Sequence, residues 1–160
     1  MNEHTLSWYN CITYKMSLGN QARVWRDTFR QESLDNISRY GFIKKALWDM
    51  QIGLIKEECS ELLEAADELY ADPENPKRRE ELVKELSDLV FVCYQYAEAF
   101  NIDLDKAMTL VFESNMSKLD EQGNPIFRPD GKVLKGPNYV EPDLSSCVPQ
   151  PNFYYDTYGK

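Results

Sequence analysis

The chain has 160 residues, 42% hydrophobic and 28% charged, and its 27 acidic and 18 basic side chains give a formal net charge of −9. This length and composition predict a folded globular protein and exclude a disordered or collagen-like chain. The negative charge disfavours a nucleic-acid polymer as partner, and no apolar run approaches the roughly 20 residues of a membrane-spanning helix. The first residues lack the basic and apolar regions of a secretory signal, so we expect a cytoplasmic location, in the host cytoplasm if a virus encodes the protein.

Three zones along the chain are expected to form one domain. Residues 1–42 are predicted to be an N-terminal helical segment, because Trp25 and Phe29 belong to a set of residues at helical spacing. Residues 43–119 follow a strong helical pattern and are predicted to form the core of a bundle. Residues 120–160 contain six of the eight prolines, so we expect a turn-rich tail that packs on the bundle.

Two breaks divide the core zone into three long helices. The first break is the two-proline segment 72–76, in which Asn75 is the expected N-cap and Pro76 the first helical residue. The second break ends at Asp103, which is the next expected N-cap. The middle helix is apolar all round over residues 89–94, and such a segment must be covered on several sides. This helix should therefore lie at the centre of a bundle.

A short β-hairpin is expected in the tail. Residues 126–128 and 132–134 flank a Pro-Asp-Gly turn, a pattern typical of two short strands. The predicted fold class is therefore all-α, a helical bundle with a non-helical C-terminal tail that contains this hairpin. Lys135 follows the second strand and is a candidate substrate-binding residue, although a solvated surface lysine is an equally good interpretation.

Two acidic pairs occupy positions where the helical pattern places a core. Glu58 lies within the apolar stripe of the first long helix, and Glu61 is its neighbour one turn later. Glu85 and Asp88 have the same spacing on the next helix, just before its apolar segment. An antiparallel hairpin brings the two pairs face to face, where they repel each other unless they share a cation. The pattern therefore predicts a magnesium site, with manganese as a substitute.

Other interpretations of this pattern are weaker. Acidic side chains are common on solvated helix faces, but the stripe position and the duplicated spacing favour a metal site. The four cysteines form no Cys-x-x-Cys motif, and His4 is the single histidine, which argues against zinc. A di-iron bundle requires Glu-x-x-His pairs, and the sequence has none.

The third helix of the core zone ends with polar residues on its buried face. The face that carries apolar side chains continues through Asn115 and Lys118. An amide and an ammonium group beside an acidic metal cluster suit the oxygens of a triphosphate. A fraying helix end, where lysine is also favourable, is the alternative interpretation.

The run IKEECSEL at 55–62, followed by ELSDLV at 85–90, resembles the paired E-x-x-E and E-x-x-D signature of the MazG-like, all-α nucleoside triphosphate pyrophosphohydrolases. The resemblance extends through 113–118, and residues 130–139 are similar to the tail of members described as phosphoribosyl-ATP pyrophosphohydrolase-like. In all it covers roughly residues 43 to 144. It implies a magnesium-dependent helical bundle that splits a nucleoside triphosphate into the monophosphate and pyrophosphate, as a homodimer or homotetramer.

The resemblance also implies roles for individual residues. Glu58, Glu61, Glu85 and Asp88 would be metal ligands, and Asn115 and Lys118 would contact metal-bound phosphates. One departure is Gln51, where many relatives have an arginine. Base recognition is expected from aromatic side chains, each of which core packing would equally explain. These candidates for stacking on the base are Trp25, Phe29 and Trp48.

The expected activity is magnesium-dependent hydrolysis of ribo- or deoxyribonucleoside triphosphates by in-line attack of an activated water. Either Glu58 or Glu61 would also accept the proton of this water, and the sequence does not choose between them. A second hypothesis is hydrolysis of phosphoribosyl-ATP, which needs similar carboxylates. A third is a non-enzymatic, acidic helical interaction protein whose carboxylates only keep it in solution.

Overall fold

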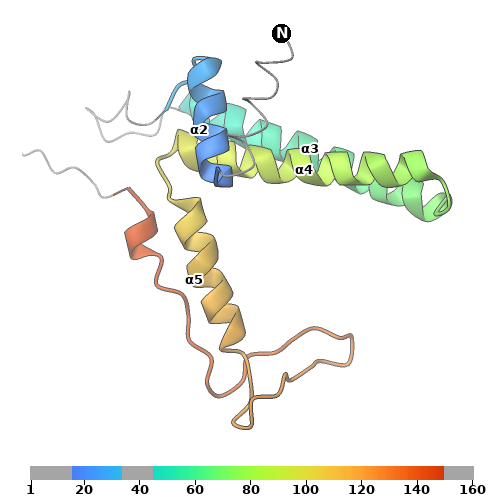
Figure 1. The fold of residues 1–160 in the computed structure, drawn as a ribbon, viewed down its shortest axis with the longest axis vertical. Coiled ribbons are helices and arrows are strands. Elements are labelled where there is room, and N and C mark those ends of the chain that lie inside the picture. The colour runs from blue at the N-terminus through green and yellow to red at the C-terminus, as the bar shows by residue number, and fades with distance from the viewer. Residues whose placement is uncertain (1–15, 34–44, 150–160) are drawn as a thin grey trace, which may run out of the picture. The chain divides into compact units, whose positions relative to one another are not determined.

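The computed structural model describes residues 16–33 and 45–149, which divide into two compact units. In the first unit are helices α2 (Leu18–Thr28), α3 (Lys45–Ala71) and α4 (Pro76–Ala99), labelled in Figure 1. The second unit, residues 103–149, contains α5 (Leu104–Met116) and the short 3-10 helix η2 (Ser145–Cys147). No strand occurs among the described residues, which confirms the all-α class.

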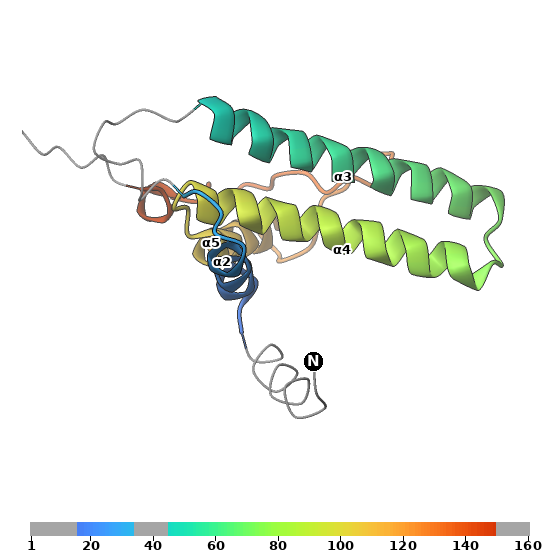
Figure 2. The ribbon, with the colours of Figure 1, turned by 90° about the horizontal axis from the view of Figure 1, so that it is seen from above.

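Helices α3 and α4 form a long antiparallel hairpin, and they run side by side in Figure 2. The Asn75 side chain accepts a hydrogen bond from the backbone N–H of Lys77 at 3.0 Å, and Pro76 opens α4. The expected N-cap and first helical residue are thus confirmed. The cap satisfies one of the backbone N–H groups that the first turn of a helix leaves without a partner, so it stabilises the start of α4. The chain reverses direction between Ala71 and Pro76.

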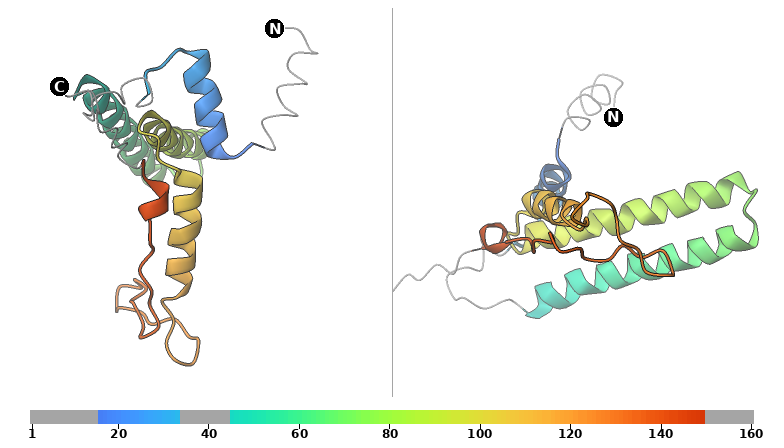
Figure 3. Two further views of the ribbon diagram at one scale, coloured as in Figure 1. Left: turned by 90° about the vertical axis from the view of Figure 1, so that its left-hand side faces the viewer. Right: turned by 90° about the horizontal axis from the view of Figure 1, so that it is seen from below.

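Helix α2 packs against α4 on the side away from α3 (Figures 2 and 3). The ring of Trp25 meets the ring of Phe91 edge to face, with centroids 6.2 Å apart. Arg23 pairs with Glu98 at 3.0 Å near the C-terminal end of α4. Two faces of α4 are therefore covered by helices of the same unit.

A third face of α4 carries apolar side chains that no described helix of the first unit covers. Val83, Leu86 and Val90 fall on one stripe, and the exposed fractions of Val83 and Leu86 are 63% and 50%. Val92 is buried, as the all-apolar segment predicts. The described helices of the first unit thus give this helix only part of the cover that a central position requires.

In the second unit, the segment that follows α5 runs back along the helix (Figure 3), and hydrogen bonds join the two. Asp103 caps α5 as predicted, since its carboxylate accepts from the N–H of Lys106 at 3.0 Å. Its own N–H donates to the carbonyl of Cys147 at 2.9 Å, which ties η2 to the start of the helix. Near the other end, the Ser114 hydroxyl donates to the carbonyl of Val140 at 2.7 Å.

The predicted β-hairpin is wrong. A turn does form, with Gly131 at a φ of 86° and a hydrogen bond from the N–H of Leu134 to the carbonyl of Ile126 at 2.8 Å. The pairing stops at one antiparallel bridge between Phe127 and Val133, so no strand develops. Both side chains are exposed, and without an apolar face to bury a two-stranded ribbon gains little stability.

Candidate metal centre

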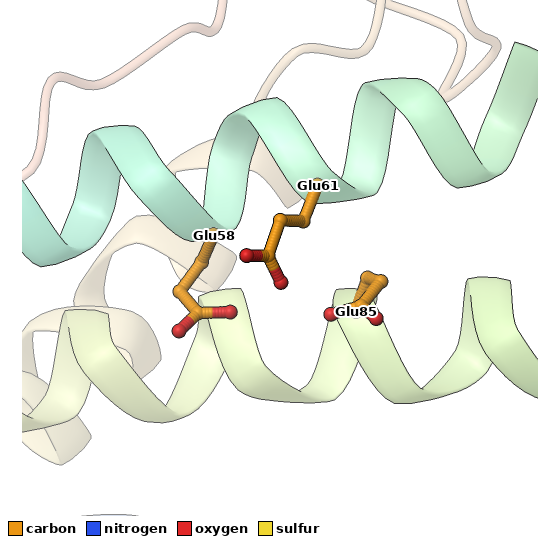
Figure 4. A group of neighbouring side chains, drawn as sticks. All are labelled: Glu58, Glu61 and Glu85. Carbon is orange, nitrogen blue, oxygen red and sulfur yellow. The ribbon is translucent and has the colours of Figure 1, made fainter.

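Three glutamates meet between the two helices of the hairpin. Glu58 and Glu61 project from successive turns of α3, and Glu85 faces them from α4 (Figure 4). Each offers a carboxylate oxygen, and these oxygens all lie within 4.8 Å of one another. Glu85 is buried, Glu58 is half-buried and Glu61 is exposed, so the group is reached from solvent on the Glu61 side.

Asp88, the fourth predicted ligand, lies one turn beyond Glu85 and is half-buried. Its carboxylate stands outside the group of three and pairs with the Lys84 ammonium at 3.0 Å. Lys84 also pairs with Glu85 at 2.9 Å. These hydrogen bonds, the one to Glu85 most of all, raise the pKa of Lys84.

The carboxylate cluster of Glu58, Glu61 and Glu85 has more negative than positive charge around it. Burial raises the pKa of Glu58, and the charges of Asp88, Glu61 and Glu85 raise it further, while Lys84 acts in the opposite sense. The three converging carboxylates, with Asp88 beside them and one ammonium group, leave a net negative site. Hard divalent cations prefer such all-oxygen donor sets, so the residues present suit Mg²⁺ or Mn²⁺.

Lys84 is the residue that sequence reasoning missed at this site. A signal was available, because Lys84 precedes Glu85 directly and stands four residues before Asp88, the spacing of a helical ion pair. That signal does not reveal that one ammonium group holds both acids at once. The double contact depends on how the long side chain folds over the helix surface.

The candidate Trp48 and the departure at Gln51 lie nearer the N-terminal end of α3. The Trp48 ring packs edge to face against Tyr96 and Phe100, with centroids 5.8 Å and 5.6 Å away, and it remains partly exposed. Gln51 has an exposed fraction of 1%, and neither polar atom of its amide has a hydrogen-bond partner within the described ranges. Trp48 is thus part of an aromatic cluster, and its contact with substrate stays a prediction.

The remaining candidates belong to the second unit. Asn115 is exposed on α5, and Lys118 follows the end of that helix and is half-buried. The Lys135 ammonium lies 4.0 Å from the centre of the Tyr139 ring and 3.4 Å from a Glu141 oxygen. Their roles in phosphate binding remain predictions, because they and the glutamates belong to different units.

Comparison with known proteins gives one family. Residues 41–115 match the sequence model of the phosphoribosyl-ATP pyrophosphohydrolase family, which agrees with the resemblance found in the sequence. The matched segment holds α3, α4 and all but the last residue of α5, and so it contains all four acidic residues described above. No curated protein matches the chain. Within the described ranges, no helix is both long and apolar enough to cross a membrane.

Proposed function

We propose that this protein is a magnesium-dependent pyrophosphohydrolase that converts nucleoside triphosphates, of the ribo or deoxy series, to the monophosphate and pyrophosphate. The match of residues 41–115 to the sequence model of the phosphoribosyl-ATP pyrophosphohydrolase family supports a reaction of this type. The observation that carries the proposal is the convergence of Glu58, Glu61 and Glu85 from two helices onto one point. A solvated acidic surface would spread such charges apart.

The four acidic residues take different parts in this proposal. Glu85 is buried and fixed by Lys84, so it is a rigid metal ligand, and Glu61 and Asp88 complete the set. Bound Mg²⁺ would neutralise the phosphate chain and acidify a water. Either Glu58 or Glu61, the two carboxylates that α3 contributes, would accept the proton of that water.

Groups outside the cluster would bind the rest of the substrate. Lys118 and Lys135 supply positive charge for the phosphates, and Asn115 supplies an amide that can donate or accept. Trp48 offers a partly exposed ring for stacking on the base.

A second copy of the chain is part of this proposal. Val83, Leu86 and Val90 form a continuous exposed apolar stripe along α4, whereas single exposed apolar residues scattered over a surface are common and need no explanation. Covering it with the same stripe of another chain would complete a bundle around α4. We therefore propose a homodimer or homotetramer.

The family match itself favours a second candidate substrate, phosphoribosyl-ATP, since the matching family is described by it. The two substrates share the phosphate chain and differ in what is attached to the base. The carboxylate cluster would act on either one, so a direct comparison of substrates is needed.

The test is release of pyrophosphate from a panel of canonical nucleoside triphosphates and from phosphoribosyl-ATP, with and without Mg²⁺. Glu58→Gln and Glu85→Gln should each lower the rate at least about a hundredfold, because they remove a proton acceptor or a metal ligand. Glu57→Gln, an exposed neighbour, is the matched control and should leave the rate unchanged.

Each outcome of this test has a definite meaning. Release from phosphoribosyl-ATP alone would replace the first substrate with the second. Release that is independent of metal, or equal in all three variants, would contradict the assigned site. No release from any compound by a folded protein, together with unchanged Mg²⁺ affinity in Glu58→Gln, would favour the acidic interaction protein.

A further inference from the structure

A polar cavity of about 340 Å³ lies between α2 and the C-terminal end of α4. Its walls come from the last turns of α2, from the segment that follows α2 and from the end of α4. The lining residues are Arg23, Arg26, Asp27, Gln31, Ser33, Glu98 and Asn101. The volume is in the range that small-molecule sites occupy, at its lower end.

Arg26 is the unusual residue of this cavity. Its exposed fraction is 3%, and its Nη2 donates to the backbone carbonyl of Glu32, while its Nη1 is buried and has no hydrogen-bond partner among the residues that the structure describes. The segment after α2 folds back over this arginine, because the N–H of Gln31 donates to the Arg26 carbonyl at 2.8 Å. A buried charged donor with no acceptor is costly and rare in native structures.

Among the charged residues that line the cavity, Arg26 is the one with a buried donor that still needs a hydrogen-bond acceptor. Nε and Nη2 of Arg23 donate to Glu98 at 3.0 and 3.4 Å, so those two charges neutralise each other. Asp27 is exposed and solvated. Burial lowers the pKa of Arg26, and the charges of Glu98 and Asp27 oppose that shift, so the guanidinium remains a cation.

This cavity is separate from the carboxylate cluster. Glu98 follows Glu85 by thirteen residues, which corresponds to about 20 Å along α4 and roughly 140° around it. The cluster lies between α3 and α4 (Figure 4). The cavity is lined by residues of α2 and of the end of α4, and α2 packs on the side of α4 away from α3 (Figure 2). One nucleotide bound at the cluster does not reach both places on a single chain.

We propose that this cavity is a second binding site, specific for a small oxyanion whose carboxylate or phosphate oxygen accepts a hydrogen bond from Arg26. An ionised oxygen gives the guanidinium the strong, charge-assisted bond that it lacks. Ser33 and Gln31 line the same space, and Ser33 carries a hydroxyl that can donate, whereas the Gln31 amide already donates to the Phe29 carbonyl at 3.3 Å. Asp27 limits the charge of the ligand, since it would repel a highly charged chain such as a triphosphate.

The experiment is calorimetric titration of the full chain with orthophosphate and, separately, with acetate, at constant ionic strength and with a chelator that removes divalent cations. Wild type should bind one or both anions saturably. Arg26→Met should weaken that binding at least about tenfold, because a hydrogen bond between charged groups is lost. Arg30→Met removes the same charge from an exposed neighbour outside the cavity and should leave the affinity unchanged.

A third variant keeps the test decisive if Arg26→Met is unstable. Asp27→Asn changes an exposed residue and removes a repulsive charge, so it should tighten anion binding about two- to fivefold. Comparing the affinity for orthophosphate with the affinity for acetate shows whether the site prefers a phosphate or a carboxylate ligand. No saturable binding of either anion, or equal loss in the two arginine variants, would overturn the proposal. Metal and nucleotide are absent throughout, so failure of the proposed hydrolysis would not affect the result.

Discussion

Gln51 shows what a single buried polar side chain does to stability. Its amide is enclosed within the first unit, and both of its polar atoms lack partners. Gln51→Met keeps the length of the side chain and removes the unsatisfied groups, so it should raise the free energy of unfolding by about 1–3 kcal/mol. Urea denaturation followed by circular dichroism measures the change.

Gln95 is the matched control for that variant. Gln95 is also buried, but among the described residues its amide is not one of the groups that are buried without a hydrogen-bond partner. Gln95→Met should therefore give no gain. An equal gain at both positions would show that added apolar volume, rather than the relieved amide, stabilises the protein.

At the scale of residues, spacing alone predicted much of the candidate site. The three-residue intervals within each acidic pair place both members on one face of a helix, and a reversal at 72–76 brings the faces together. Spacing does not predict which carboxylates converge. Asp88 turns to Lys84, and that choice depends on side-chain rotamers and local charge.

At the scale of elements, two glycines separate the effect of tertiary packing on stability from the effect of local helix propensity. A Cβ on Gly136 would lie 2.2 Å from the carbonyl oxygen of Leu119, so Gly136→Ala forces the backbone of the second unit apart. The expected loss is about 1–3 kcal/mol. Hydrogen exchange of the amides in α5 and the tail measures it.

Gly53 is the opposite case, because it lies inside α3 and a Cβ there meets no atom within 4 Å. Gly53→Ala should stabilise the first unit by about 0.5–1 kcal/mol, since alanine loses less backbone entropy in a helix. Urea denaturation checks this variant as well. Destabilisation by Gly53→Ala would mean that the position is covered in the assembled protein.

The elements that were predicted correctly are those with local causes. Asn75, Pro76 and Asp103 act on backbone groups within three residues of themselves, and all three lie where the sequence places them. The β-hairpin depended on an apolar partner surface that its sequence does not describe. Glycine is needed at position 136 because of the carbonyl of Leu119, seventeen residues earlier, so the local sequence around Gly136 does not predict this need.

At the scale of the whole molecule, the bare stripe on α4 predicts self-association. Leu86→Lys places a charge in the middle of the stripe and should shift the protein toward the monomer, because burying that charge is unfavourable. Size-exclusion chromatography with light scattering measures the mass. Leu86→Met conserves volume and apolar character, and it should assemble like wild type.

A monomeric wild type at micromolar concentration would contradict this prediction. The sequence indicated an all-apolar segment in α4 that needs cover on several sides, and the structure shows that α2 and α3 supply only part of it. A single chain does not reveal what covers the rest. That is why fold class follows from the sequence more readily than assembly does.

The lysine that joins Glu85 and Asp88 has a consequence for handling the protein in chelating buffers. When divalent ions are stripped away, Lys84 remains as a tethered counter-charge on α4. The hairpin should therefore stay folded through cycles of depletion and reloading, unlike small domains that unfold when their metal leaves. At the proposed metal site, loading would exchange one cation for another, because the divalent ion would take over the Glu85 carboxylate that Lys84 holds.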